Sequence, residues 1–183
     1  YDKYKTGLDT LKDVVDHSEF IFIGLPTPAF NDNGEVDLRI VEENIKNIHD
    51  IVDEDNDKIV IIKSTVTPGT TDMFALKYKK LKFVMSPEFL TGVDNKIGFL
   101  NSSRHILGGD KEDVERLEEL YRYRFGNTTP IFKTSRSKAE LTKYASNLFF
   151  ACKVTFFNYI YDVCEKLDIE YDEIKDQVFA DQR

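Results

Sequence analysis

The feature that most constrains the fold is a set of apolar runs that show no alternation of apolar and polar residues. They lie within the expected strands 20–25, 58–63 and 81–85, and stretches with helical spacing separate them. A strand that is buried on both faces is apolar at every position, whereas a strand with one wet face alternates. The pattern therefore predicts an α/β fold with a partial doubly wound (Rossmann-like) parallel sheet, followed by a long helix.

The remaining elements follow from periodicity and from glycine and proline positions. Apolar spacing predicts a helix over residues 36–53, which we expect Asp37 to start. Residues 91–103 carry glycines and polar side chains, and this composition predicts an ordered loop. Further strands are expected at 105–107 and 130–132, and further helices at 71–79, 111–124 and 172–180.

Residues 137–167 form one long predicted helix without glycine or proline. Its aromatic and aliphatic residues are distributed nearly all round the helix axis. A helix that is apolar on every face must be buried. A partial sheet of this size cannot cover it alone, so we expect a second subunit or a further domain to pack against it.

Composition excludes several classes of partner. The net charge of −8 argues against nucleic acid and against an anionic membrane. No apolar run approaches the roughly 20 residues that span a bilayer, and no signal peptide is evident, so we expect a cytoplasmic protein. Cys152 and Cys164 lie about 18 Å apart on one predicted helix, too far for a disulfide, and we expect both to be buried thiols. No metal site is expected.

Polar residues follow two of the buried strands. Ser64 and Thr65 come after the second run, and Glu88 comes after the third. In a doubly wound sheet, ligands bind at the carboxyl ends of the strands. Thr65 is therefore a candidate catalytic hydroxyl and Glu88 a candidate acid or base, with a turn hydroxyl and a salt-bridged surface glutamate as the alternatives.

Lys143 and Asn147 lie four residues apart near the start of the long helix and share one face of it. An ammonium group and an amide that point at one position would stabilise an oxyanion. The alternative is a solvent-exposed ion pair between Glu140 and Lys143.

Two segments are candidates for cofactor binding. Leu25, Pro26, Thr27 and Pro28 end the first apolar run, where prolines fix a backbone that could pass under a cofactor; a simple strand stop is the alternative. Asp2 could be the acidic residue that binds ribose hydroxyls at the end of a preceding strand, or part of a frayed terminus.

Taken together, these segments resemble the UDP-glucose/GDP-mannose dehydrogenase family from about residue 20 to residue 183. Each motif is weak alone, but the ordered set is specific. The set is Pro26-Thr27-Pro28, Lys63-Ser64-Thr65-Val66, Ser86-Pro87-Glu88-Phe89-Leu90, and Ala139-Glu140-Leu141 with Lys143-Tyr144-Ala145 and Asn147.

The resemblance implies an NAD-dependent enzyme that oxidises the C6 alcohol of a nucleotide sugar to a carboxylate in two hydride transfers. UDP-glucose, giving UDP-glucuronate, is the default substrate. By resemblance, Lys143 and Asn147 hold the C6 oxygen, Glu88 does acid–base work and Thr65 positions water. The resemblance further implies cofactor contacts at Ser64 and residues 25–28, backbone contacts to the substrate at Phe89 and Leu90, and an arginine, Arg183, that reaches the substrate of a neighbouring subunit.

The same resemblance divides the chain into an incomplete NAD-binding domain, residues 1–135, and a central helical dimerisation segment, residues 136–183. It implies a homodimer through the 137–167 helix. The family's phosphate-binding glycine turn would precede this chain, and its nucleophilic cysteine would follow Arg183. We therefore expect these residues alone not to turn over. Gly92 and Thr67 stand where the family usually has a glutamate and a proline.

Two other interpretations remain open at this point. A non-catalytic module could retain only the dimerising helix and a sugar-nucleotide contact surface. A β-hydroxyacid dehydrogenase of related fold would also use a lysine and an asparagine on a helix, without needing a cysteine.

Overall fold

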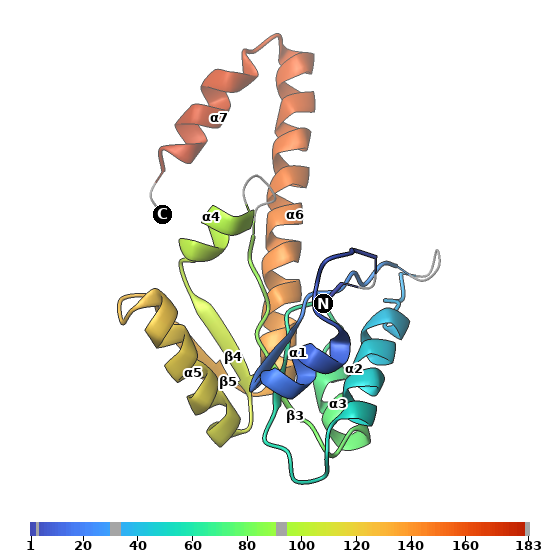
Figure 1. The fold of residues 1–183 in the computed structure, drawn as a ribbon. Coiled ribbons are helices and arrows are strands. Elements are labelled where there is room, and N and C mark those ends of the chain that lie inside the picture. Colours follow the sequence, from blue (N-terminus) through green and yellow to red (C-terminus); the bar gives the residue numbers. More distant parts are fainter. Residues whose placement is uncertain (3, 30–33, 91–94, 182–183) are drawn as a thin grey trace. The chain divides into compact units, whose positions relative to one another are not determined.

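The computed structural model describes residues 1–2, 4–29, 34–90 and 95–181. The chain divides into two compact units, Tyr1–Lys143 and Tyr144–Arg183, and each is described by itself. The first unit contains a five-stranded sheet with helices on both faces (Figure 1). The second consists of the remainder of one long helix and a shorter helix after it.

The strands lie in the order in which they occur in the sequence. They are β1 (Phe20–Ile23), β2 (Ile59–Ile62), β3 (Lys82–Met85), β4 (His105–Gly109) and β5 (Ile131–Thr134). β1, β2 and β3 are parallel, and β4 and β5 are parallel to each other. The α/β, Rossmann-like fold class is confirmed.

One strand pair corrects the prediction of a parallel sheet. β4 runs antiparallel to β3, with Val84 opposite Gly109 and Met85 opposite Gly108. A parallel return needs a crossover that spans the strand length, usually a helix packed on the sheet. The described residues of this connection contain one helix, the six-residue α4 (Asn95–Leu100), about 9 Å long, and the chain turns back beside β3.

The core has two layers, one on each face of the sheet. One face packs against α1 (Leu11–His17), α2 (Arg39–Ile51) and α3 (Thr70–Lys77), and the other packs against α5 (Lys111–Phe125). Side chains of β2 alternate between the faces, with Val60 and Ile62 on one and Ile59 and Ile61 on the other, and all four are fully buried. The expectation of strands buried on both faces therefore holds for β2.

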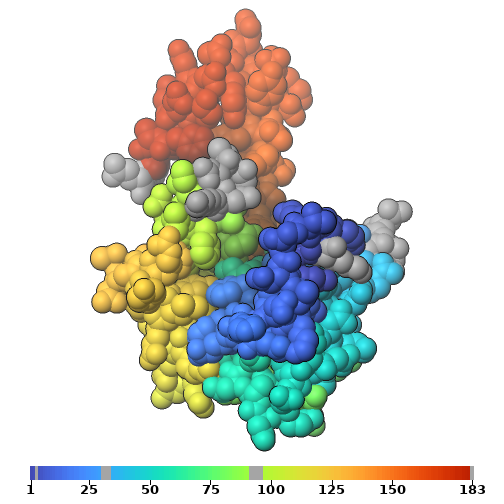
Figure 2. Space-filling model, in the orientation of Figure 1, coloured from blue at the N-terminus to red at the C-terminus, as the bar shows by residue number. Residues whose placement is uncertain are grey.

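Local signals explain where the structure differs from the predicted elements. Helix α1 was not predicted, although Thr10 and Asp13 form a capping box at its start. Figure 2 shows the segment around it lying against α2, and Val15 joins the same core. Helix α2 begins at Arg39 rather than at residue 36, because Val36 pairs with Ala29 in a short bridge. The loop predicted for residues 91–103 contains α4.

Helix α6 (Arg136–Leu167) begins in the first unit and continues into the second, where α7 (Tyr171–Phe179) follows it. Phe157 stacks on Phe179 with ring centroids 4.8 Å apart. Many other large apolar side chains of this unit are exposed, namely Leu148, Phe149, Phe150, Val154, Phe156, Tyr159, Tyr161 and Val178. Cys164 is buried as expected, but the expectation for Cys152 is wrong, because its side chain is exposed.

Among the residues that the structure describes, no helix combines the length and the apolar character needed to cross a bilayer.

Candidate active site

The ends of several strands meet at one edge of the sheet. Because β1, β2 and β3 are parallel, their carboxyl ends share this edge. Since β4 is antiparallel to β3, its first residue His105, and Arg104 directly before it, come to the same edge. The edge therefore collects side chains from four strands, and it is where ligands bind in sheets of this kind.

A lysine–glutamate pair lies at this edge. The Lys143 ammonium donates to the Glu88 backbone carbonyl at 2.5 Å and to its carboxylate oxygen Oε1 at 3.1 Å. The other carboxylate oxygen accepts the N–H of Leu90 at 2.6 Å, which fixes the turn after β3. Lys143 is 6% exposed, and its Nζ lies 5.3 Å from the centre of the Phe89 ring. The structure thus brings together four of the predicted site residues.

Glu140 binds the start of α3 and does not form the solvent-exposed ion pair with Lys143 that was the alternative interpretation. Its carboxylate is fully buried and accepts the N–H groups of Gly69 and Thr71 at 2.6 and 2.7 Å and the Thr71 hydroxyl at 2.6 Å. Helix α3 has no side-chain cap of its own, so Glu140 supplies its capping acceptor from α6. The surface pair between Glu140 and Lys143 is therefore wrong, and Glu140 fixes the helix from which Lys143 projects.

The hydroxyl groups after β1 and β2 hold the two loops together. Ser64 Oγ accepts the Leu25 N–H at 2.8 Å and donates to the Leu25 carbonyl at 2.7 Å. Thr27 Oγ1 donates to the Thr65 carbonyl at 2.7 Å. Ser64 and Thr27 thereby set the path of the residue 25–28 backbone, and Thr65 is half-buried beside it.

The β1 loop leaves room for a ligand at its surface. Gly24, Pro26 and Pro28 are exposed, and a Cβ added at Gly24 would meet nothing within 4 Å. Neither proline has an N–H to satisfy. The backbone of this loop is therefore braced by Ser64 and Thr27 and open to solvent.

Lys63 belongs to one of the motifs of the sequence but was not among the predicted site residues. Lys63, at the end of β2, donates to Ser86 Oγ at 3.3 Å and to the Pro87 carbonyl at 3.5 Å. Burial, aided by the charge of Lys143 and opposed by that of Glu88, lowers the pKa of Lys63 to about 8. The sequence signal that could have identified Lys63 as a site residue is its position directly after an apolar strand.

Arg104 and His105 reach the same edge only because β4 is antiparallel. The Arg104 guanidinium lies 4.4 Å from the centre of the Phe89 ring. His105 is 5% exposed, and burial, together with the charges of Lys63 and Arg122, lowers its pKa to about 4. Within the described part of the chain, its Nε2 is buried without a hydrogen-bond partner.

The remaining predicted residues lie elsewhere. The Asp2 carboxylate accepts the Tyr4 N–H at 3.0 Å and pairs with Lys5, and the first of these contacts lowers the pKa of Asp2. Asn147 follows Lys143 by four residues in α6 and belongs to the second unit. Arg183 and Gly92 lie outside the described residues. Among residues that the structure describes, no group of three or more His, Cys, Asp or Glu side chains is placed to hold a metal ion.

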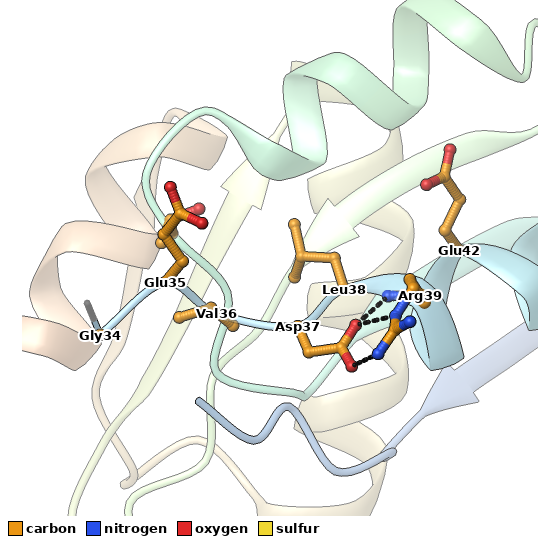
Figure 3. A pocket seen from close by; sticks show the side chains of 8 residues that line it. Gly34, Glu35, Val36, Asp37, Leu38, Arg39 and Glu42 are labelled. Carbon is orange, nitrogen blue, oxygen red and sulfur yellow. Dashed lines mark hydrogen bonds and ion pairs between the residues drawn. The ribbon is translucent and has the colours of Figure 1, made fainter. Parts of the chain in front are cut away.

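A cavity of about 600 Å³ lies at the start of α2 (Figure 3). Asp37 and Arg39 form an ion pair at 2.7 Å in its wall, and hydrogen bonds from Arg39 lower the pKa of Asp37 to about 2. The wall also includes Gly34, Glu35, Val36, Leu38, Glu42 and Thr67, and none of the predicted site residues.

The fold and the edge site place this chain among the dehydrogenases with a Rossmann-like fold. Residues 3–124 match the NAD binding domain of the UDP-glucose/GDP-mannose dehydrogenase family, and residues 137–183 match its central domain. The chain belongs to this family, whose cofactor is NAD.

Individual relatives agree with this assignment. The chain is 32% identical to a UDP-glucose 6-dehydrogenase of Rhizobium meliloti, over 96% of its own length and 42% of that protein. It is similar to a UDP-glucose dehydrogenase structure from Pyrobaculum islandicum (TM-score 0.85, 26% identity, 96% and 42% covered). It is also similar to a GDP-mannose dehydrogenase structure from Pseudomonas aeruginosa (TM-score 0.83, 27% identity, 94% and 41% covered). The chain spans about two fifths of the length of each of these proteins.

Proposed function

We propose that this chain supplies the cofactor side and the charged pair of an NAD-dependent nucleotide-sugar 6-dehydrogenase. In this proposal the enzyme oxidises the C6 alcohol of UDP-glucose to the carboxylate of UDP-glucuronate in two hydride transfers. The observation that carries the proposal is the ion pair between buried Lys143 and half-buried Glu88 at the carboxyl edge of the sheet. Its support from relatives is the similarity to a UDP-glucose 6-dehydrogenase of Rhizobium meliloti.

The pair suits alcohol oxidation because the two groups have opposite tasks. The Lys143 ammonium would donate a hydrogen bond to the C6 oxygen as negative charge develops there. The Glu88 carboxylate would accept the proton that leaves, since it already lies within hydrogen-bond reach of Lys143. NAD, when bound, accepts the hydride. Asn147, one helical turn beyond Lys143, would donate a second hydrogen bond, and Thr65 would position water.

The binding contacts follow from the same edge. We propose that residues 25–28, Ser64 and Asp2 contact the cofactor. Ser64 also braces the loop through its two hydrogen bonds with the Leu25 backbone. The backbone at Phe89 and Leu90 would contact the sugar nucleotide. Arg183 would reach the substrate of a neighbouring subunit.

The second unit is proposed to form a dimer. Its exposed aromatic side chains, Phe149, Phe150, Phe156 and Tyr159 among them, would otherwise leave a large apolar surface in water. We therefore propose that residues 1–135 form the cofactor domain and that residues 136–183 form the dimerisation segment.

The test is NADH formation with UDP-glucose, compared between this chain and the complete protein. We expect no steady turnover by residues 1–183, and two NADH per UDP-glucose from the complete protein. One NADH per substrate, with an aldehyde or ketone as product, would indicate the chemistry of a β-hydroxyacid dehydrogenase. Binding of UDP-glucose without turnover by the complete protein would indicate a non-catalytic module. GDP-mannose and UDP-N-acetylhexosamines serve as competing substrates.

A further inference from the structure

We propose that Lys63 is a positioning residue of this site, which holds residues 86–88 in place and acts on the Glu88–Lys143 pair through its charge. Only the expected effect of Lys63 on kcat/KM rests on the proposed function. Lys63 is not among the residues to which the proposed mechanism gives a chemical step.

The first argument is geometric. Lys63 ends β2 and its ammonium donates to Ser86 Oγ and to the Pro87 carbonyl, the two residues directly before Glu88. Ser86 is 1% exposed, and its hydroxyl also hydrogen-bonds to that of Tyr121 at 3.0 Å. The Glu88 backbone carbonyl accepts a hydrogen bond from Lys143. Two ammonium groups therefore hold the segment that carries Glu88.

The second argument is electrostatic. The Lys63 ammonium interacts favourably with the Glu88 carboxylate and unfavourably with the Lys143 ammonium. On its remaining side it faces the Phe99 ring at 5.6 Å, and its charge also disfavours protonation of His105. Because Lys143 and His105 are buried and Lys63 and Glu88 are half-buried, their mutual charges are less screened than on an open surface.

The charge of Lys63 changes within the range of an ordinary assay. With a pKa of about 8, Lys63 is charged at pH 7 and neutral above pH 9. With Lys63 charged, the three groups Lys63, Lys143 and Glu88 sum to +1, and with Lys63 neutral they sum to 0. A site with net positive charge favours a developing oxyanion, so loss of the Lys63 proton should weaken transition-state binding.

The kinetic test compares two variants with opposite charge behaviour in the complete protein. Lys63→Arg stays charged and Lys63→Met stays neutral across the assay range. We expect kcat/KM of the native enzyme to follow the arginine variant below pH 7 and the methionine variant above pH 9, with the two variants differing on the order of tenfold. Parallel pH profiles for all three proteins would mean that Lys63 only braces the backbone, and would overturn the proposal.

A second measurement can be made on a protein without activity. It distinguishes failure of the Lys63 proposal from failure of the proposed dehydrogenase function. The reactivity of Lys63 toward acetic anhydride, read by mass spectrometry against pH, gives its protonation midpoint. We expect a midpoint near 8 that Glu88→Gln lowers and Lys143→Met raises, while the exposed Glu119→Gln leaves it unchanged. A midpoint insensitive to both site variants would sink the inference even if the enzyme is active. The expected shifts in an inactive protein would support it while removing the proposed function.

Discussion

The Glu140 carboxylate and the Thr71 hydroxyl lie 2.6 Å apart, although the two residues are separated by 69 positions in the chain. This contact joins the start of α6 to the start of α3. Lys143 lies three residues after Glu140 in the same helix, so the contact fixes the helix that presents Lys143 to Glu88. A capping interaction between two helices thereby determines the geometry of the charged pair.

Replacement of Glu140 by glutamine should therefore destabilise the first unit. The amide has one acceptor oxygen for three donors and turns its own NH2 group toward one of them. We expect a loss of about 2–4 kcal/mol in the free energy of unfolding, measured by urea titration. Glu119→Gln, at an exposed position of α5, should change it by less than about 0.5 kcal/mol. Equal effects of the two variants would contradict the capping role.

Gly108 allows α6 to approach β4 closely. A Cβ at this position would lie 2.7 Å from the Ala139 side chain and 2.7 Å from the Ser135 carbonyl oxygen. Because the carbonyl belongs to the backbone, it cannot rotate away, and Gly108→Ala should cost about 1–3 kcal/mol in thermal or urea unfolding. Gly24→Ala, where the added Cβ meets nothing within 4 Å, is the matched control. A Gly108 variant as stable as the control would show that this approach is not tight.

His105 should make the protein sensitive to acid. Its pKa is about 4 in the folded chain against an ordinary value of 6.5, so the unfolded chain binds the extra proton between these values. Stability contributed by neutral His105 is complete above pH 6.5 and is lost as the pH falls toward 4, by about 3 kcal/mol.

The readout for His105 is the change of unfolding free energy with pH, compared between the native protein and His105→Phe. The phenylalanine keeps a ring among Phe99, Tyr121 and Phe125 but cannot be protonated. We expect the stability difference between the two proteins to move in favour of the variant between pH 7 and pH 4. A constant difference would contradict the burial argument.

Lys143 should be essential for turnover by the complete enzyme. Lys143→Met keeps most of the aliphatic chain but removes the donor to the developing oxyanion, so we expect kcat to fall about a hundredfold to a thousandfold. Lys138→Met, at an exposed position one turn and a half earlier in α6, should leave kcat close to the native value. If both variants retained native kcat in the NADH assay, the proposed role of Lys143 would be wrong.

The sequence by itself determined the elements and part of the site. Continuous apolar runs predicted β1, β2 and β3, because a strand covered on both faces is apolar at every position. This burial holds for β2, whereas Phe22 of β1 is exposed. Helical spacing predicted α2, α5 and α6 to within a few residues. The resemblance carried by the ordered motifs assigned Glu88 and Lys143 to one site, and in the structure the two side chains are in contact.

The tertiary structure alone decided the direction of β4, the cap that Glu140 supplies and the burial of Lys63. Each depends on contacts between segments far apart in the chain, and such contacts leave no periodic pattern in the sequence. Nothing local distinguishes Glu140 from a solvent-exposed glutamate until the uncapped start of α3 is brought to it. Likewise, Lys63 is an ordinary strand-end lysine until Ser86, Phe99 and Lys143 surround it and remove the water that would keep its pKa normal.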